Sequence, residues 1–334
     1  MTMPELIRTV RWMVRDTLKQ SISTKLFWVM VAAAAVATLV CLSVSVTGDT
    51  PALAEPWDHP GMLPKGEADK IGRDNLKLDG VREITGEMTL GFGAFQVAVG
   101  RNREDSVKQL QLVLVALVAD TAGVLLALLW TAGFLPTFLE PQAATVLLAK
   151  PAPRWAILLG KYVGVVLFVG LAAALYIGGT WLALGLRTGV WTGAYWLAVP
   201  VLMTNFGIFY AVSAFLAVWT RSTVASAFGT LLFWGVCTAT NVTRHHLIAF
   251  PPEGITPTAM LLSEIGYWLL PKPVDLGAIF FDALGAGQYR IQAADIQAVQ
   301  ATGRLNPGLS VAASMAFAAG TLGMACYEFE QTDY

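Results

Sequence analysis

Few side chains in this sequence have the types and spacing that catalysis or metal binding requires. Three histidines are present. His245 and His246 are neighbours, so on a helix they point about 100° apart and would not share a metal ion, and His59 stands alone in a proline-rich stretch. No HExxH, GxSxG or paired-cysteine motif occurs, and Gly160-Lys161 lacks the other residues of a P-loop. We therefore expect no enzymatic activity, no metal and no cofactor on this chain.

Asp120 is the one acidic residue well inside an apolar run. Residues 110–132 contain 12 Leu or Val, which together favour membrane insertion by about 5 kcal/mol against a cost of roughly 3 kcal/mol for a central Asp. Acids within a span are functional hypotheses by default, and Asn205 is the nearest polar residue by depth. Two interpretations stay open for Asp120: a hydrogen-bonded structural role, or a place on a translocation path.

The composition is that of a membrane protein. Of 334 residues, 55% are hydrophobic and 13% are charged, against roughly 25% charged in soluble domains. The net charge of −1 provides no basic surface for nucleic acid. One helix needs about 20 apolar residues to cross a bilayer. Six transmembrane helices are predicted, at residues 26–46, 109–133, 155–186, 194–219, 222–243 and 309–327.

Basic residues near the ends of these helices predict the orientation. Residues 1–25 carry five basic and two acidic side chains, whereas residues 47–108 carry 8 basic and 11 acidic side chains. Because basic flanks stay in the cytoplasm, residues 1–25, 134–154 and the tail 328–334 are expected there. The segments 47–108 and 244–308 are then expected outside.

Residues 1–25 are predicted to form an amphipathic helix that lies in the membrane interface, in contact with lipid. Its apolar side contains Leu6, Val10, Val14, Leu18 and Ile22, with Met13 and Thr17 beside them. Its basic side contains Arg8, Arg11, Arg15 and Lys19. The helix is either a topology anchor or a lateral helix that moves with a cytoplasmic partner.

The two outer segments differ in character. Residues 81–84 and 87–100 alternate enough to predict short strands around Gly91-Phe92-Gly93, so 47–108 is expected to be a small β-containing insert that caps the helices. Residues 244–308 contain apolar stretches between prolines that are too short to span, typical of interfacial or re-entrant helices. The fold class predicted is an all-α polytopic membrane protein with this insert.

The segment 134–154 joins the second and third spans on the cytoplasmic side. Its centre reads as a short helix bracketed by prolines, because Pro151 and Pro153 interrupt the chain before Arg154. Its pattern consists of Glu140, Thr145, Leu147, Leu148, Lys150, Pro151 and Arg154, followed by Gly160-Lys161. This pattern resembles the signature of ABC-2 type transporter permeases, and the six spans, interfacial N-terminal helix and cytoplasmic termini are similar to that family's topology.

The resemblance implies a transport subunit in the cytoplasmic (inner) membrane of a bacterium. A second permease copy and a separate ATP-binding cassette subunit would be its partners, with ATP and Mg²⁺ bound by that subunit. The segment from Glu140 to Arg154 would be the coupling helix that docks on the ATPase. Export is the direction implied, and the substrate is open.

Two other functions stay open. A membrane anchor or assembly scaffold would bind partners through residues 47–108 and 244–308. A proton-coupled secondary transporter would use Asp120, but that class usually requires further ionisable groups within the spans.

Overall fold

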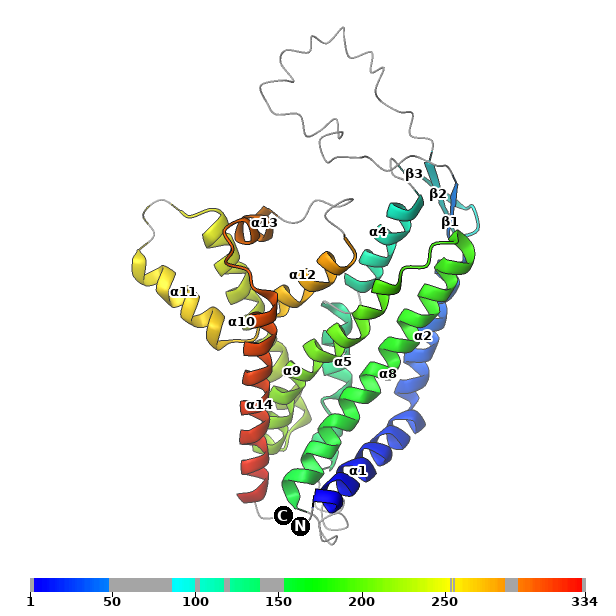
Figure 1. Cartoon of the computed structure of the whole chain (residues 1–334). Coiled ribbons are helices and arrows are strands. Elements are labelled where there is room, and N and C mark those ends of the chain that lie inside the picture. Colours follow the sequence, from blue (N-terminus) through cyan, green and yellow to red (C-terminus); the bar gives the residue numbers. More distant parts are fainter. Residues whose placement is uncertain are drawn as a thin grey trace.

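The structure is a computed structural model that describes residues 3–47, 86–99, 103–116, 121–138, 153–252, 254, 256–285 and 294–331. Within this part the chain is mainly helical (Figure 1). The N-terminal elements are α1 (Met3–Ser23), α2 (Lys25–Leu42), β1 (Ser45–Thr47), β2 (Gly86–Leu90), β3 (Phe95–Val99), α4 (Arg103–Val115), α5 (Ala122–Thr131) and α6 (Phe134–Phe138). The others are α8 (Arg154–Thr188), η3 (Gly193–Leu197), α9 (Ala198–Thr220), α10 (Thr223–Ala249), α11 (Pro257–Leu269), α12 (Pro273–Ala283), α13 (Ala294–Ala301) and α14 (Pro307–Gln331).

Four described helices are long and apolar enough to cross a membrane. They are α8, η3 continued into α9, α10 and α14, and a fifth span results if α1 and α2, bent by 69° at their junction, form one crossing. These helices are typical of a membrane-embedded protein. The count of six spans stays a prediction.

Two predicted spans have different bounds in the structure. The first ends at Leu42 rather than at residue 46, because residues 45–47 leave the helix and pair as strand β1. The second, predicted over 109–133, contains the last part of α4 (Arg103–Val115) and the whole of α5 (Ala122–Thr131). Residues 117–120, which include Asp120, lie outside the described residues.

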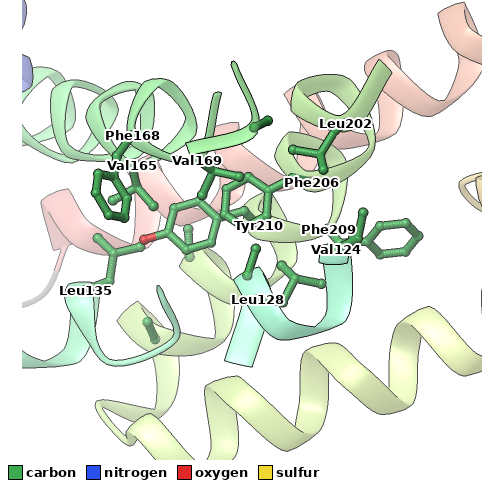
Figure 2. Packing of buried hydrophobic residues seen from close by; sticks show 14 of the residues in the cluster. Val124, Leu128, Leu135, Val165, Phe168, Val169, Leu202, Phe206, Phe209 and Tyr210 are labelled. Carbon is green, nitrogen blue, oxygen red and sulfur yellow. The ribbon is translucent and has the colours of Figure 1, made fainter. Parts of the chain in front are cut away.

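The core forms where α8 and α9 pack on each other and on α5. Figure 2 shows Phe168 of α8, Phe206 and Tyr210 of α9, and Leu128 of α5 in one cluster. The rings of Phe206 and Tyr210 stack with centroids 5.1 Å apart. The apolar runs that predicted the spans therefore pack on protein along one side.

Sharp helix ends allow the long helices to lie side by side. Helix α8 ends at Gly189, whose φ of 72° is left-handed and whose N–H bonds to the carbonyl of Gly185. Helix α9 ends at Arg221, also left-handed with φ 53°, and Ser222 then caps α10 by accepting a hydrogen bond from the amide of Ala225.

The start of α1 and the end of α14 lie at one end of the bundle (Figure 1). The three-stranded antiparallel sheet, in the order β1-β2-β3, lies at the opposite end, next to α2 and α8. Helices α11 and α12 diverge from the short connection between them and pack on α10 and α14 (Figure 1). We call this V-shaped pair the α11–α12 hairpin.

Candidate functional site

Helix α1 packs against the first half of α8 through two glycines. A Cβ atom added at Gly160 would lie 2.6 Å from Cβ of Met13, and one added at Gly164 would lie 2.7 Å from Cβ of Thr17. Both distances are shorter than van der Waals contact, so the close approach of the helices requires glycine at both positions. We call this contact, formed by Met13, Thr17, Gly160 and Gly164, the α1–α8 seam.

The seam determines which side of α1 packs on α8. The fully buried line is Met13, Thr17 and Ser21, whereas Val10, Val14 and Leu18 are only half-buried and Ile22 is exposed. The reason is steric, because the notch at Gly160 and Gly164 accepts the Met13 and Thr17 side chains. The predicted basic side is exposed along Arg8, Arg11, Arg15 and Lys19.

Lys161 links the seam to the neighbouring helix α6. Its side chain is 3% exposed, and its Nζ donates a 2.8 Å hydrogen bond to Oε1 of Gln20 on α1. The same Nζ lies 5.5 Å from the ring centroid of Phe138 on α6, and the Asp16 carboxylate interacts with it electrostatically. A buried ammonium needs such partners because its desolvation costs several kcal/mol. Lys161 therefore connects α1, α6 and α8 at one point.

A cavity of about 800 Å³ adjoins this point. Lys19 and Gln20 line it from α1, Trp130 from α5, Phe138 from α6 and Lys161 from α8. It lies next to Phe138, the last described residue before the segment 139–152.

Most of the predicted docking residues lie outside the described part of the chain. They are Glu140, Thr145, Leu147, Leu148, Lys150 and Pro151. Arg154 is the first residue of α8 and is half-buried. Asn205 is buried on α9, and its relation to Asp120 lies outside the described residues.

A second group of polar residues is buried at the other end of the bundle, around Asp275 of α12. Its Oδ1 accepts a 3.1 Å hydrogen bond from Nδ2 of Asn241 and lies 3.2 Å from Nε2 of His245, both on α10. Its Oδ2 accepts hydrogen bonds from Tyr267 Oη of α11 at 2.5 Å and from Ser310 Oγ of α14 at 2.6 Å. We call these five residues the Asp275 cluster. It joins α10, α11, α12 and α14 through one carboxylate.

Two cations flank this cluster. The Arg244 guanidinium lies 3.9 Å from the ring centroid of Tyr267 and pairs with Glu264 at 3.2 Å. The Lys272 Nζ lies 4.8 Å from the same ring centroid. Lys272 is buried at the tip of the α11–α12 hairpin, and its main-chain N–H donates to Ser314 of α14 at 3.1 Å. Because cations over aromatic faces are stabilised electrostatically, Tyr267 holds both charges beside the carboxylate.

The charge states follow from these contacts. Burial alone would raise the pKa of Asp275, but hydrogen bonds from His245, Ser310 and Tyr267 outweigh it and place the pKa below its ordinary value. Burial lowers the pKa of Lys272, and the Asp275 carboxylate opposes that shift. Burial, followed by the charge of Asp275, raises the pKa of Tyr267. The carboxylate is therefore ionised and the phenol neutral at physiological pH.

The Asp275 cluster was not predicted from the sequence. The sequence indicated only that His245 and His246 would not share a metal ion, whereas His245 is 1% exposed and close to Asp275. A signal was available, because Asn241, Arg244 and His245 recur at the spacing of one helix face. Of this pair of histidines, only His246 is exposed.

In the described part of the chain no group of three or more His, Cys, Asp or Glu residues could hold a metal ion. Neither a protein-family model nor a curated protein matches this sequence.

Proposed function

We propose that this chain is the membrane-spanning permease subunit of an ABC transporter of the ABC-2 type. It would move its substrate, outward by analogy with the family, with ATP and Mg²⁺ bound and ATP hydrolysed by a separate subunit. Two permease copies and two ATPase subunits would form the complex in a bacterial inner membrane. The chain would have no enzymatic activity of its own.

The observation that supports this proposal most directly is the contact made by Lys161. It ties α6, which precedes the segment 139–152, to α8, which follows that segment, and ties both to α1. A displacement applied by a partner to the segment would therefore reach two helices and the N-terminal helix together. A segment that couples an ATPase to a permease requires such a connection. A change of state in the ATPase can alter the permease only through contacts that link the two.

Helix α8 provides a path from that contact to the far end of the bundle. It is continuous over 35 residues, which corresponds to about 52 Å at 1.5 Å per residue. Its length exceeds the thickness of a bilayer core, about 30 Å. A tilt imposed at Arg154 would move the opposite end of α8, near Gly189.

Docking of the ATPase is proposed at Glu140 to Arg154. Leu147 and Leu148 would provide apolar contact, and Glu140, Lys150 and Arg154 would set the position by charge. Arg154 is the member of this group that the structure describes, at the first turn of α8. Charge reversal there would oppose docking while leaving the apolar spans unchanged.

The test is co-purification in mild detergent with ATP-binding subunits from the same cell, followed by ATPase assays with and without this chain. We expect a stable complex whose ATPase activity depends on the permease, and we expect Arg154→Glu to abolish that dependence. Arg187→Glu is the matched control, because Arg187 is exposed in the last turn of the same helix. Equal behaviour of the two variants would contradict docking at Arg154. Absence of any ATPase partner would favour an anchor or scaffold.

A further inference from the structure

The turn between β2 and β3 carries two phenylalanines that pack on little of the described chain. Phe92 is 77% exposed and Phe95 is 68% exposed. The turn has an unusual backbone, because Gly91, Phe92 and Gly93 all have positive φ, of 64°, 57° and 97°. Phe92 thus has a left-handed backbone, which is uncommon for residues other than glycine, and its ring lies on the surface of the turn.

The register of the sheet determines where this turn lies. Strand β1 continues away from the end of α2, and β2 pairs with it antiparallel, with Thr47 opposite Glu87 and Ser45 opposite Thr89. Strand β2 therefore runs back toward α2, and the turn at its end returns to the level of the last turn of that helix. The amide of Gly91 confirms this placement by donating a 3.0 Å hydrogen bond to Oγ of Ser43, the residue that follows α2.

The level of the turn coincides with the end of the apolar surface of the bundle. Cys41, two residues before Ser43, and Val44, directly after it, are buried together with Ala183 and Leu184 of α8. The apolar part of α8 ends just beyond these residues, since Arg187 follows. An apolar bundle surface ends where the hydrocarbon of the bilayer gives way to the headgroups, and interfacial segments bury Phe, Trp and Leu side chains at this boundary.

The exposed apolar surface below the turn is continuous with it. Val36, Leu39 and Val40 in the second half of α2 are all more than half exposed. In a bilayer, exposed aliphatic residues on an apolar helix such as α2 are available for contact with lipid acyl chains. The β2–β3 turn that carries Phe92 and Phe95 therefore lies at the level where α2 ends, because Gly91 of this turn bonds to Ser43, and Figure 1 shows the sheet next to that end of α2.

We propose that the Gly91–Phe95 turn is a lipid-binding wedge whose two phenylalanine rings enter the bilayer at the boundary between acyl chains and headgroups. The partner is the lipid surface itself. The proposal rests on the register, the Ser43 contact and the exposure of the two rings, and it is independent of any transport function. The wedge would fix the sheet, and with it the end of α2, at a defined height on the membrane.

Spin labelling of the full chain in lipid nanodiscs tests the proposal. A nitroxide is attached at Phe92→Cys or Phe95→Cys after replacement of the native cysteines Cys41, Cys237 and Cys326. The control is Gln96→Cys, because Gln96 is exposed and points to the opposite face of β3 from Phe95. Collision rates with oxygen, which dissolves in lipid, are compared with those of a water-soluble nickel chelate.

We expect oxygen collisions to exceed nickel collisions at positions 92 and 95, and the reverse at position 96. Nickel collisions that dominate at all three positions would overturn the proposal and place the turn in water. Low rates with both reagents at positions 92 and 95 would also overturn it and indicate a protein partner, including a second copy. A lipid signature at all three positions would contradict a wedge, because the sheet would then lie flat in the membrane.

A second measurement avoids the cysteine replacements. The photo-reactive residue p-benzoylphenylalanine is introduced at position 92, 95 or 96 in the otherwise unchanged chain, and the irradiated protein is weighed by mass spectrometry. Phospholipid adducts at 92 and 95 but not at 96 are expected. Adducts absent from 92 and 95 in a folded protein would overturn the proposal.

Discussion

Replacing Asp275 with alanine tests whether one carboxylate holds the α11–α12 hairpin on the bundle. The side chain receives hydrogen bonds from α10, α11 and α14, and all of its partners are buried. The change removes the acceptor and leaves the donors in place. It also removes the negative charge that faces the buried ammonium of Lys272.

The expected loss can be worked out from these contacts. Each buried donor left without an acceptor costs roughly 1–3 kcal/mol. Tyr267 and Ser310 can compensate in part because their hydroxyl oxygens lie 3.0 Å apart, whereas the donors of Asn241 and His245 cannot pair in that way. Breaking a buried charge pair from one side costs about 3–5 kcal/mol. We therefore expect Asp275→Ala to lower the free energy of unfolding by about 3–5 kcal/mol.

Asp275→Asn should cost less, about 1–2 kcal/mol. The amide keeps the shape and one acceptor oxygen, but bonds to a charged acceptor are stronger than bonds to a neutral one. Asp282→Ala is the matched control, because Asp282 is exposed seven residues later on the same helix, and exposed substitutions stay within about 0.5 kcal/mol.

The assay is reversible unfolding in mixed detergent micelles, followed by tryptophan fluorescence. An Asp275→Ala variant no less stable than Asp282→Ala would refute the reasoning, because the hairpin would then be held by apolar contacts alone. The pH dependence is a second check. Since the folded-state pKa of Asp275 is lowered, its contribution is fully present above the ordinary value of about 3.9. The stability difference between the wild type and Asp275→Asn should therefore shrink only as the pH falls below about 4.

Two further predictions concern the α8 interfaces. Gly160→Ala should lower the free energy of unfolding by about 1–3 kcal/mol, because the new methyl group would overlap Met13. Gly235→Ala is the control and should not lower it, because a methyl group there would meet open space. Equal effects of the two variants in the same unfolding assay would contradict close packing at the α1–α8 seam. Tyr210→Phe should raise stability by about 1 kcal/mol, because its buried hydroxyl has no hydrogen-bond partner among the described residues. Tyr162→Phe should lower stability by a similar amount, because its hydroxyl donates a 2.8 Å hydrogen bond to a main-chain carbonyl of α9. The rings of Tyr162 and Tyr210 stack on each other, so changes in stability of the same sign for the two variants would refute the difference in hydrogen bonding between their hydroxyl groups.

The sequence predicted the long helices well where hydropathy alone determines them. The predicted span 155–186 lies within α8 (Arg154–Thr188), and 309–327 lies within α14 (Pro307–Gln331). It failed to predict where α2 ends, because Ser45 and Val46 are as compatible with a helix as with a strand until their partner strand, 40 residues later, is considered. Pairing between distant segments is not encoded in local hydropathy.

The two polar sites escaped prediction for a related reason. An Asp in a proline-rich segment and a His near a helix end are ordinary surface residues in sequence. Asp275 and His245 became a buried pair only because the α11–α12 hairpin folds back onto α10. Lys161 belongs to the Gly160-Lys161 pair of the resemblance to ABC-2 permeases. Its hydrogen bond to Gln20 could not be predicted, because the two residues lie 141 positions apart in the sequence.

The two ends of the bundle illustrate different ways of fixing one helix on another. At the α1–α8 seam, two glycines remove side-chain volume so that Met13 and Thr17 fit, and the one buried charge, Lys161, has the neutral oxygen of Gln20 as its hydrogen-bond partner. Such a contact depends on shape and on one hydrogen bond to a neutral acceptor, so α1 and α8 are held together by fewer polar contacts than the helices around Asp275. At the Asp275 cluster a full carboxylate is bonded from three other helices, and sliding any of them would leave buried groups unpaired. The helices α10, α11, α12 and α14 should therefore move as one body relative to the group formed by α1, α6 and α8, which Lys161 connects.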